Sequence, residues 1–199
     1  MKTTATLAAV LICTGTLGQA TCPQAGALAT GIKVTLSDGS AETFKSIGPG
    51  RVENYTDAGK PDGNYNILAQ GIYLRATSQL SDGIVDSSSR ITYNFPLADD
   101  QMPLPVPGGR WDVEVAVLEG GSIDSEIHAI SFGQNARYTI GACGYDMIPV
   151  VIRIGPEDDW IEETLYYLPT LEIALYSKYD AIDEPEEVYV YTGIEAMSP

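Results

Sequence analysis

The stretch RWDVEVAVL, residues 110–118, carries the clearest signal of fold class in this chain. Apolar side chains stand at its odd positions, from Trp111 to Val117, and the even positions begin with Arg, Asp and Glu. Successive side chains of a β-strand point to opposite faces, so this alternation predicts a strand with one buried and one wet face. The same period recurs in other runs, at 32–36, 91–95, 148–154 and 171–175.

Turn signals separate these runs. The pairs Asp38-Gly39, Asp82-Gly83 and Gly120-Gly121 predict hairpins, because glycine readily adopts the positive φ that such turns need. No stretch combines apolar residues at helical spacing with a capping residue. We therefore expect an all-β fold with little or no helix: an antiparallel meander of about ten strands that forms a sandwich or a partly open barrel.

One segment interrupts the meander. Residues 96–109, PLADDQMPLPVPGG, contain four prolines and end in two glycines. Proline cannot donate to a strand ladder, so a central strand is excluded here. We expect either a crossover between two sheets or a long loop over one mouth of the barrel.

The N-terminal residues have the pattern of a signal peptide. Lys2 precedes an apolar stretch without acids, and Gly18 and Ala20 are the small residues that a signal peptidase accepts before its cleavage point. We expect residues 1–20 to be removed, leaving residues 21–199 as a single β-rich domain that is exported and is periplasmic or extracellular. No later apolar run reaches the roughly 20 residues of a transmembrane segment. A lipid anchor on Cys22 is the alternative, although the preceding residues match its motif poorly.

The cysteines are few, at positions 13, 22 and 143. Removal of the signal peptide takes away Cys13 and leaves two, and exported chains fold in an oxidising compartment. We therefore predict a disulfide between Cys22 and Cys143. A reactive thiol is disfavoured, because the chain has no CxxC motif.

Charge excludes some classes of partner. The chain has 27 acidic against 11 basic residues and a formal net charge of −16, which repels phosphate backbones and anionic membrane surfaces. Nucleic acid is therefore not an expected partner. Hydrophobic residues make up 44% of the chain and charged residues 19%, which distinguishes it from a disordered acidic tail.

Signals of catalysis or metal binding are weak. His128 is the only histidine and shares the parity of apolar neighbours, as expected of a hydrogen-bonded packing residue, and no serine lies in a GxSxG motif. No catalytic residue and no cofactor is predicted. Asp57, Asp62 and Asn64, with glycines between them, form the best calcium candidate, against a simple turn. A pair of carboxylates for glycoside cleavage remains open, because their separation depends on the fold.

Tyrosines gather near the C-terminus, where six of the twelve lie. They form either a packed cross-strand cluster inside the sheet or an aromatic-lined groove for a sugar, a lipid or a peptide. In VYVYTG, residues 188–193, tyrosines occupy one face and valines the other, which predicts a strand covered on both sides. The ligand-binding candidates are Trp160, Tyr167, Tyr176, Tyr189 and Tyr191.

The C-terminal segments resemble a group of uncharacterised exported β-rich proteins of proteobacteria. The resemblance rests on YTIGACGYDMIPVVIRI (138–154), ETLYYLPTLEIALYSKYD (163–180) and VYVYTGI (188–194). These proteins are in turn loosely similar to the open half-barrels of periplasmic lipoprotein carriers, which implies a half-barrel fold. The lid helices of the carriers have no counterpart in this sequence, and no functional residue is carried over.

These observations favour a non-catalytic extracytoplasmic domain. Its expected partner is a small apolar or amphipathic ligand of unknown identity, held in the half-barrel, or an envelope protein. Two alternatives stay open: a carboxylate-type enzyme that acts on glycans, and a purely structural envelope protein.

Overall fold

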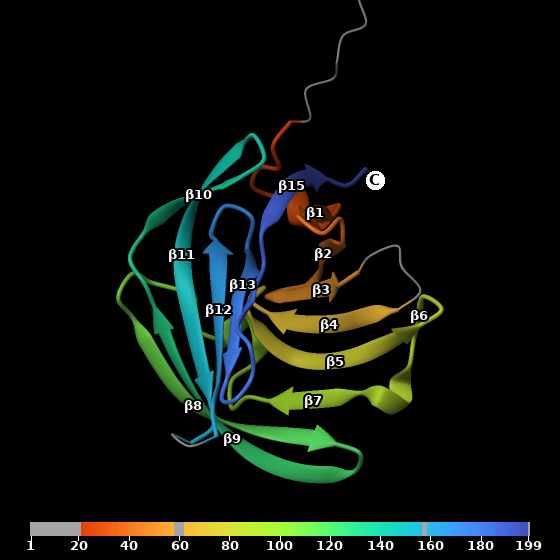
Figure 1. Ribbon diagram of the computed structural model, residues 1–199, viewed down its shortest axis with the longest axis vertical. Helices are drawn as coiled ribbons and strands as arrows, with labels where there is room; N and C mark the ends of the chain where they lie inside the picture. Colours follow the sequence, from red (N-terminus) through yellow and green to blue (C-terminus); the bar gives the residue numbers. More distant parts are fainter. Residues whose placement is uncertain (1–20, 58–61, 157–158, 199) are drawn as a thin grey trace, which may run out of the picture.

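The computed structural model describes residues 21–57, 62–156 and 159–198, and its strands form one sheet in which every ladder is antiparallel (Figure 1). The all-β antiparallel fold is thereby confirmed. The sheet contains fifteen strands: β1 (Ile32–Leu36), β2 (Ala41–Gly48), β3 (Arg51–Tyr55), β4 (Gly63–Ala69), β5 (Tyr73–Ser81), β6 (Ile84–Val85), β7 (Ile91–Asn94), β8 (Arg110–Glu119), β9 (Ser122–Phe132), β10 (Ala136–Ile140), β11 (Cys143–Ile154), β12 (Ile161–Leu168), β13 (Ile173–Ala181), β14 (Glu187–Val188) and β15 (Tyr191–Ala196).

The expected number of about ten strands is too low. Two strands, β6 and β14, contain only two residues each, too few to show alternation. In β3 and β4 the polar residues Asn54 and Asn66 are cross-strand partners and hydrogen-bond each other, so hydrophobicity marks these strands poorly. Helix is limited, within the described part of the chain, to three short 3₁₀ turns: η1 (Ala27–Ala29), η2 (Ser87–Ser89) and η3 (Asp99–Gln101).

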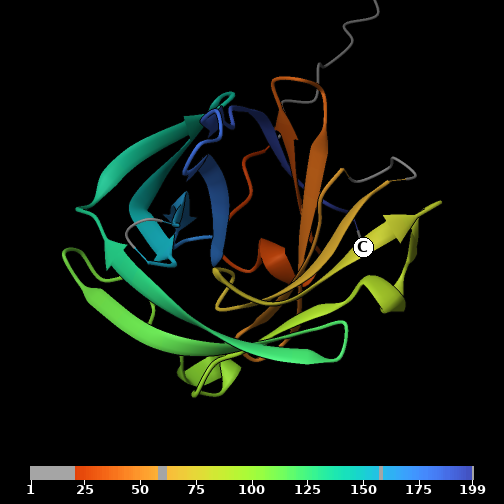
Figure 2. The ribbon, with the colours of Figure 1, turned by 60° about the horizontal axis from the view of Figure 1, so that its bottom comes forward.

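The strands follow one another as a meander. Their order across the sheet is β14-β13-β12-β11-β9-β8-β7-β5-β4-β3-β2-β1-β15, with β10 beside β11 and β6 beside β5. A sandwich needs two separate sheets, so that alternative is wrong for this chain. The sheet instead curls, and β11–β13 lie across its interior from β1–β5 (Figure 2).

The two ends of this sheet are consecutive in the chain. Strand β14 pairs with β13, and β15, which follows it closely, pairs with β1. The two residues between them connect the ends: the Tyr189 amide donates to the Ser177 carbonyl at 3.0 Å, and the Val190 carbonyl accepts from the Ser37 amide at 2.8 Å. The C-terminal segment 187–196 therefore lies against both ends of the curled sheet.

Tyr189 and Tyr191 lie on the inner side of this segment, but its valines are not covered. Val188 is 63% exposed and Val190 is 52% exposed. The expectation of a strand covered on both sides is therefore wrong. The segment lies where the two ends of the sheet meet, and nothing in the described part of the chain packs over the outer face of the segment.

Two clusters of buried side chains fill the fold. The first includes Ile32, Val34 and Leu175, and the second includes Val115, Ile130 and Val150. Strand β11 contributes to both, because its buried residues change parity between Met147 and Ile148: Cys143, Tyr145 and Met147 enter the first cluster, and Ile148, Val150 and Ile152 the second.

A disulfide joins Cys22 to Cys143, as predicted, with their Cα atoms 5.5 Å apart. It fixes the start of the described chain to the first residue of β11. A hydrogen bond from the Tyr145 hydroxyl to the Pro23 carbonyl, at 3.2 Å, is a second contact that holds the same segment. The predicted signal peptide, residues 1–20, lies outside the described residues, as does Cys13.

The proline-rich segment 96–109 connects β7 to β8, which are direct neighbours in the sheet. It therefore links two paired strands of the same sheet. Met102 is buried in the second cluster, and the Tyr73 hydroxyl donates to the Pro103 carbonyl, so the segment packs closely against the sheet.

Candidate functional site

A cavity of about 430 Å³ lies inside the curled sheet, bordered by both hydrophobic clusters. Ligand sites commonly have volumes of roughly 300–1,000 Å³, so the space is large enough for a small molecule. Part of its wall is apolar and part is polar. Its apolar wall includes Phe44, Ile72, Phe95, Ile152, Leu165 and Ala174.

Glu42 of β2 is the first carboxylate of the polar wall. Its Oε1 accepts a hydrogen bond from the Tyr191 hydroxyl at 3.0 Å, and its Oε2 accepts one from the Asn54 amide at 3.2 Å. Asn66 orients that amide by donating to the Asn54 Oδ1 at 2.8 Å. Burial raises the pKa of Glu42, although both hydrogen bonds act in the opposite direction.

Glu163 of β12 is the second carboxylate of the same cavity. The Tyr176 hydroxyl, from the neighbouring strand β13, hydrogen-bonds to it. Burial raises the pKa of Glu163, and the charge of Glu126 adds to the effect. Burial also raises the pKa of Tyr176, with Glu163 as the next cause, so this hydroxyl remains a hydrogen-bond donor at neutral pH.

The charges of Glu42 and Glu163 both affect the pKa of Tyr189. Its ring centroid is 6.0 Å from that of Tyr176, and both rings line the cavity. Burial, the hydrogen bond to Glu187, and the charges of Glu42 and Glu163 raise its pKa to about 12. Glu42 and Glu163, which both line the cavity, thus both raise the pKa of this tyrosine.

His128 of β9 also lines the cavity and is buried. Its Nε2 lies 3.1 Å from Glu126 Oε2, and its ring meets the Phe95 ring edge-on at 5.7 Å. Burial lowers the pKa of His128, so the ring is neutral at neutral pH. These contacts are those of a hydrogen-bonded packing residue, as its parity indicates.

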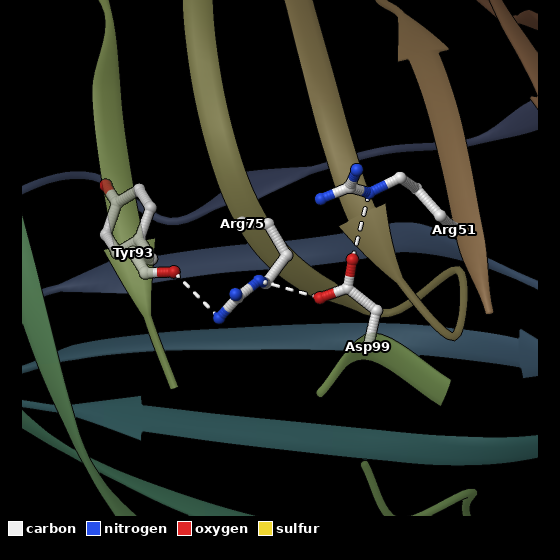
Figure 3. Close-up of polar contacts among 4 residues, drawn as sticks. All are labelled: Arg51, Arg75, Tyr93 and Asp99. Atoms are coloured by element: carbon white, nitrogen blue, oxygen red, sulfur yellow. Dashed lines mark hydrogen bonds and ion pairs between the residues drawn. The ribbon is translucent and has the colours of Figure 1, made fainter. Parts of the chain in front are cut away.

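An ionic cluster lies beside the cavity (Figure 3). Asp99, in the proline-rich segment, binds the Nε of Arg51 through Oδ2 and the Nε of Arg75 through Oδ1, both at 2.9 Å. Arg75 also donates to the Tyr93 carbonyl at 3.1 Å and lies over the Phe95 ring. Tyr93 and Phe95 line the cavity, so the cluster connects the segment to its wall.

The calcium candidates are only partly brought together. Asp57 and Asn64 line the cavity, whereas Asp62 is exposed and does not. Within residues 21–57, 62–156 and 159–198, no three His, Cys, Asp or Glu side chains are grouped so that they could hold a metal ion. Because residues 58–61 of this loop lie outside the described residues, calcium binding stays a prediction.

The structure separates the five aromatic candidates. Tyr176 and Tyr189 line the cavity. Tyr191 belongs to the first hydrophobic cluster and reaches the cavity through its bond to Glu42, and Tyr167 is packed in the second cluster. Trp160 lies under the Arg153 guanidinium, 4.8 Å from its ring centroid, and does not line the cavity.

Sequence reasoning did not single out Glu42, Glu163, Asn54 or Asn66. A signal was nevertheless present for the two acids. Glu42 shares the parity of buried Phe44 in β2, and Glu163 shares that of buried Leu165 in β12. An acid at the buried parity of a strand is unusual and indicates a functional or paired carboxylate.

Fold and site together define a class: an all-β protein whose curled sheet encloses a cavity with both apolar and acidic walls. No protein-family model and no curated protein matches this chain. Among solved structures, it is similar to the hypothetical lipoprotein YmcC from Escherichia coli K12, with 11% identity and a TM-score of 0.44. The alignment covers 86% of this chain and 92% of that chain. A likeness at this level carries no argument about function.

Proposed function

We propose that this chain is a non-catalytic extracytoplasmic domain that binds a small amphipathic ligand inside its curled sheet. The single observation that carries the proposal is the cavity of about 430 Å³, which is lined by both apolar residues and hydrogen-bonding side chains. An amphipathic molecule matches both walls, because its tail replaces water at apolar surface and its head satisfies polar groups. The Cys22–Cys143 disulfide supports an exported location.

The cavity wall favours a resident ligand over simple packing. Phe44, Ile72 and Leu165 are buried residues that border open space. Protein interiors are close-packed, and voids larger than a water molecule are few. A space of this size that also contains polar groups is therefore a binding site or a pool of water, and ligand binding distinguishes the two.

A displacement assay with a fluorescent amphiphile tests the proposal. Ala174 lines the cavity from β13, so Ala174→Leu places additional atoms in the space and is expected to reduce binding at least tenfold. The control is Ala116→Leu, at a half-buried position of β8 that does not line the cavity. No saturable binding by the wild type, or equal loss in both variants, contradicts the proposal.

A carboxylate-type enzyme acting on glycans is the second candidate. It is favoured by one observation: Glu42 and Glu163 line the same cavity beside two tyrosines. In such an enzyme, the acid with the higher pKa protonates the glycosidic oxygen of the leaving group. The other carboxylate acts as a base or a nucleophile on the opposite side of the scissile bond. Release of reducing ends from envelope glycans, abolished in Glu163→Gln, would support it, and absence of turnover removes it.

None of the described helices combines the length and apolarity needed to cross a bilayer.

A further inference from the structure

The charges around the cavity are of one sign. Among the described residues that line it, Glu42 and Glu163 are carboxylates, and none is a lysine or an arginine. Arg75, the cation beside the wall, already binds Asp99 at 2.9 Å. Carboxylates that are withdrawn from water are normally paired with cations, and none of the described residues that line the cavity supplies a lysine or an arginine to Glu42 or Glu163.

Glu42 is held in position while it keeps capacity to accept further hydrogen bonds. Tyr191 and Asn54 each donate to a different oxygen of this carboxylate. An ionised carboxylate has about four acceptor sites, so two donors leave room for others. The Asn66–Asn54 bond fixes the amide that holds it. A ligand with N–H groups therefore meets an oriented acceptor.

The aromatic residues beside the carboxylates add a second element of cation recognition. The Tyr176 and Tyr189 rings are 6.0 Å apart at an interplanar angle of 60°, and both line the cavity. The face of an aromatic ring attracts an ammonium group through the negative end of the ring's quadrupole. Burial raises the pKa of both carboxylates, which means that a bound cation would relieve the cost of their ionisation.

We propose that the ligand of this cavity carries a cationic amine group, which lies among Glu42, Glu163, Tyr176 and Tyr189, while its apolar part lies against Ile152, Leu165 and Phe95. This inference rests on the proposed function and specifies the class of ligand: amphiphiles with an alkylammonium head. Lipids and free organic amines share that chemistry.

The test compares three probes with the same tail and different heads: decylammonium, decanol and decanoate. Calorimetric titrations of the protein are made at about pH 8, where the amine is protonated. We expect decylammonium to bind at least about tenfold more tightly than decanol, as a desolvated cation–carboxylate contact with cation–π support implies. Decanoate should bind most weakly of the three.

Variants locate the effect. Glu163→Gln and Glu42→Gln should each reduce the affinity for decylammonium several-fold more than the affinity for decanol. The control is Glu162→Gln: Glu162 neighbours Glu163 on β12, points to the opposite face of the sheet and does not line the cavity. Circular dichroism confirms that each variant is folded.

The outcomes separate the two proposals. Decanol or decanoate binding as tightly as decylammonium overturns the cationic head and leaves the amphiphile site standing. Binding of none of the three probes overturns both. A preference for decylammonium that survives in both cavity variants also overturns the assignment to Glu42 and Glu163. Comparison of decylammonium with a lysolipid that has an amine head then distinguishes a free amine from a lipid as the source.

Discussion

Removal of the Cys22–Cys143 disulfide should produce a large loss of stability. The bonded residues are 121 positions apart in sequence. In the chain-entropy model, cross-linking a loop of this length destabilises the unfolded chain by about 5 kcal/mol, and measured values for disulfides are typically 2–4 kcal/mol. For Cys22→Ala/Cys143→Ala we therefore expect the free energy of unfolding to fall by about 2–5 kcal/mol.

Urea unfolding followed by circular dichroism measures this loss. Comparison of the wild type with and without a reductant separates the contribution of the covalent bond from that of Cys143 packing. The Cys143 side chain is buried in the first cluster. The alanine variant should not respond to the reductant. Other contacts hold the same segment, among them the Tyr145–Pro23 hydrogen bond and buried Leu28. A loss below about 1 kcal/mol would refute the reasoning, because it would show that only the N-terminal segment detaches while the sheet stays folded.

Three further predictions concern stability. The raised pKa of Glu163 contributes stability that is fully present below its unfolded pKa of about 4.5 and is lost as pH rises through the folded pKa. In urea titrations, the stability of the wild type relative to Glu163→Gln should therefore fall as pH rises above about 4.5, and a pH-independent difference contradicts this. Asp99→Asn removes the charge that binds Arg51 and Arg75, and calorimetry should show a loss of about 1–3 kcal/mol in the free energy of unfolding. An unchanged melting temperature would show that this ionic cluster does not stabilise the fold. Ile130→Ala truncates a side chain with 0% exposure, so chemical denaturation should show a loss of about 2–5 kcal/mol in the free energy of unfolding. Ile123→Ala, at a position with 74% exposure, should lower it by less than about 0.5 kcal/mol. Equal losses would be inconsistent with the core described above.

The fold class could be predicted because alternation in a strand reports directly on burial. In RWDVEVAVL the three odd valines are all buried in β8, and Glu114 between them is exposed. The disulfide could also be predicted, since only Cys22 and Cys143 lie outside the predicted signal peptide. The number of strands could not, because a two-residue strand such as β14 is defined by its neighbours and has no period of its own.

The candidate site was harder to predict for a different reason. Its polar wall combines Glu42 of β2 with Glu163 of β12, and no local sequence pattern indicates that these two strands line the same cavity. Tyr176 and Tyr189 could be selected from their clustering, yet Tyr167 belongs to the same cluster in sequence and is a packing residue. Whether a tyrosine faces a cavity or a core depends on how the sheet curls, which is a property of the whole chain.

The C-terminal segment 187–196 also constrains how the protein is made. Strand β15 pairs Ala196 with Ile32 of β1, and β14 covers the other end of the sheet at β13. Until these last residues have been synthesised, β1 and β13 both present unpaired backbone groups along an open edge. Such edges are templates for pairing with other chains. A premature stop at Glu187 therefore yields a chain with two aggregation-prone edges, although it lacks only the final thirteen residues of the 199.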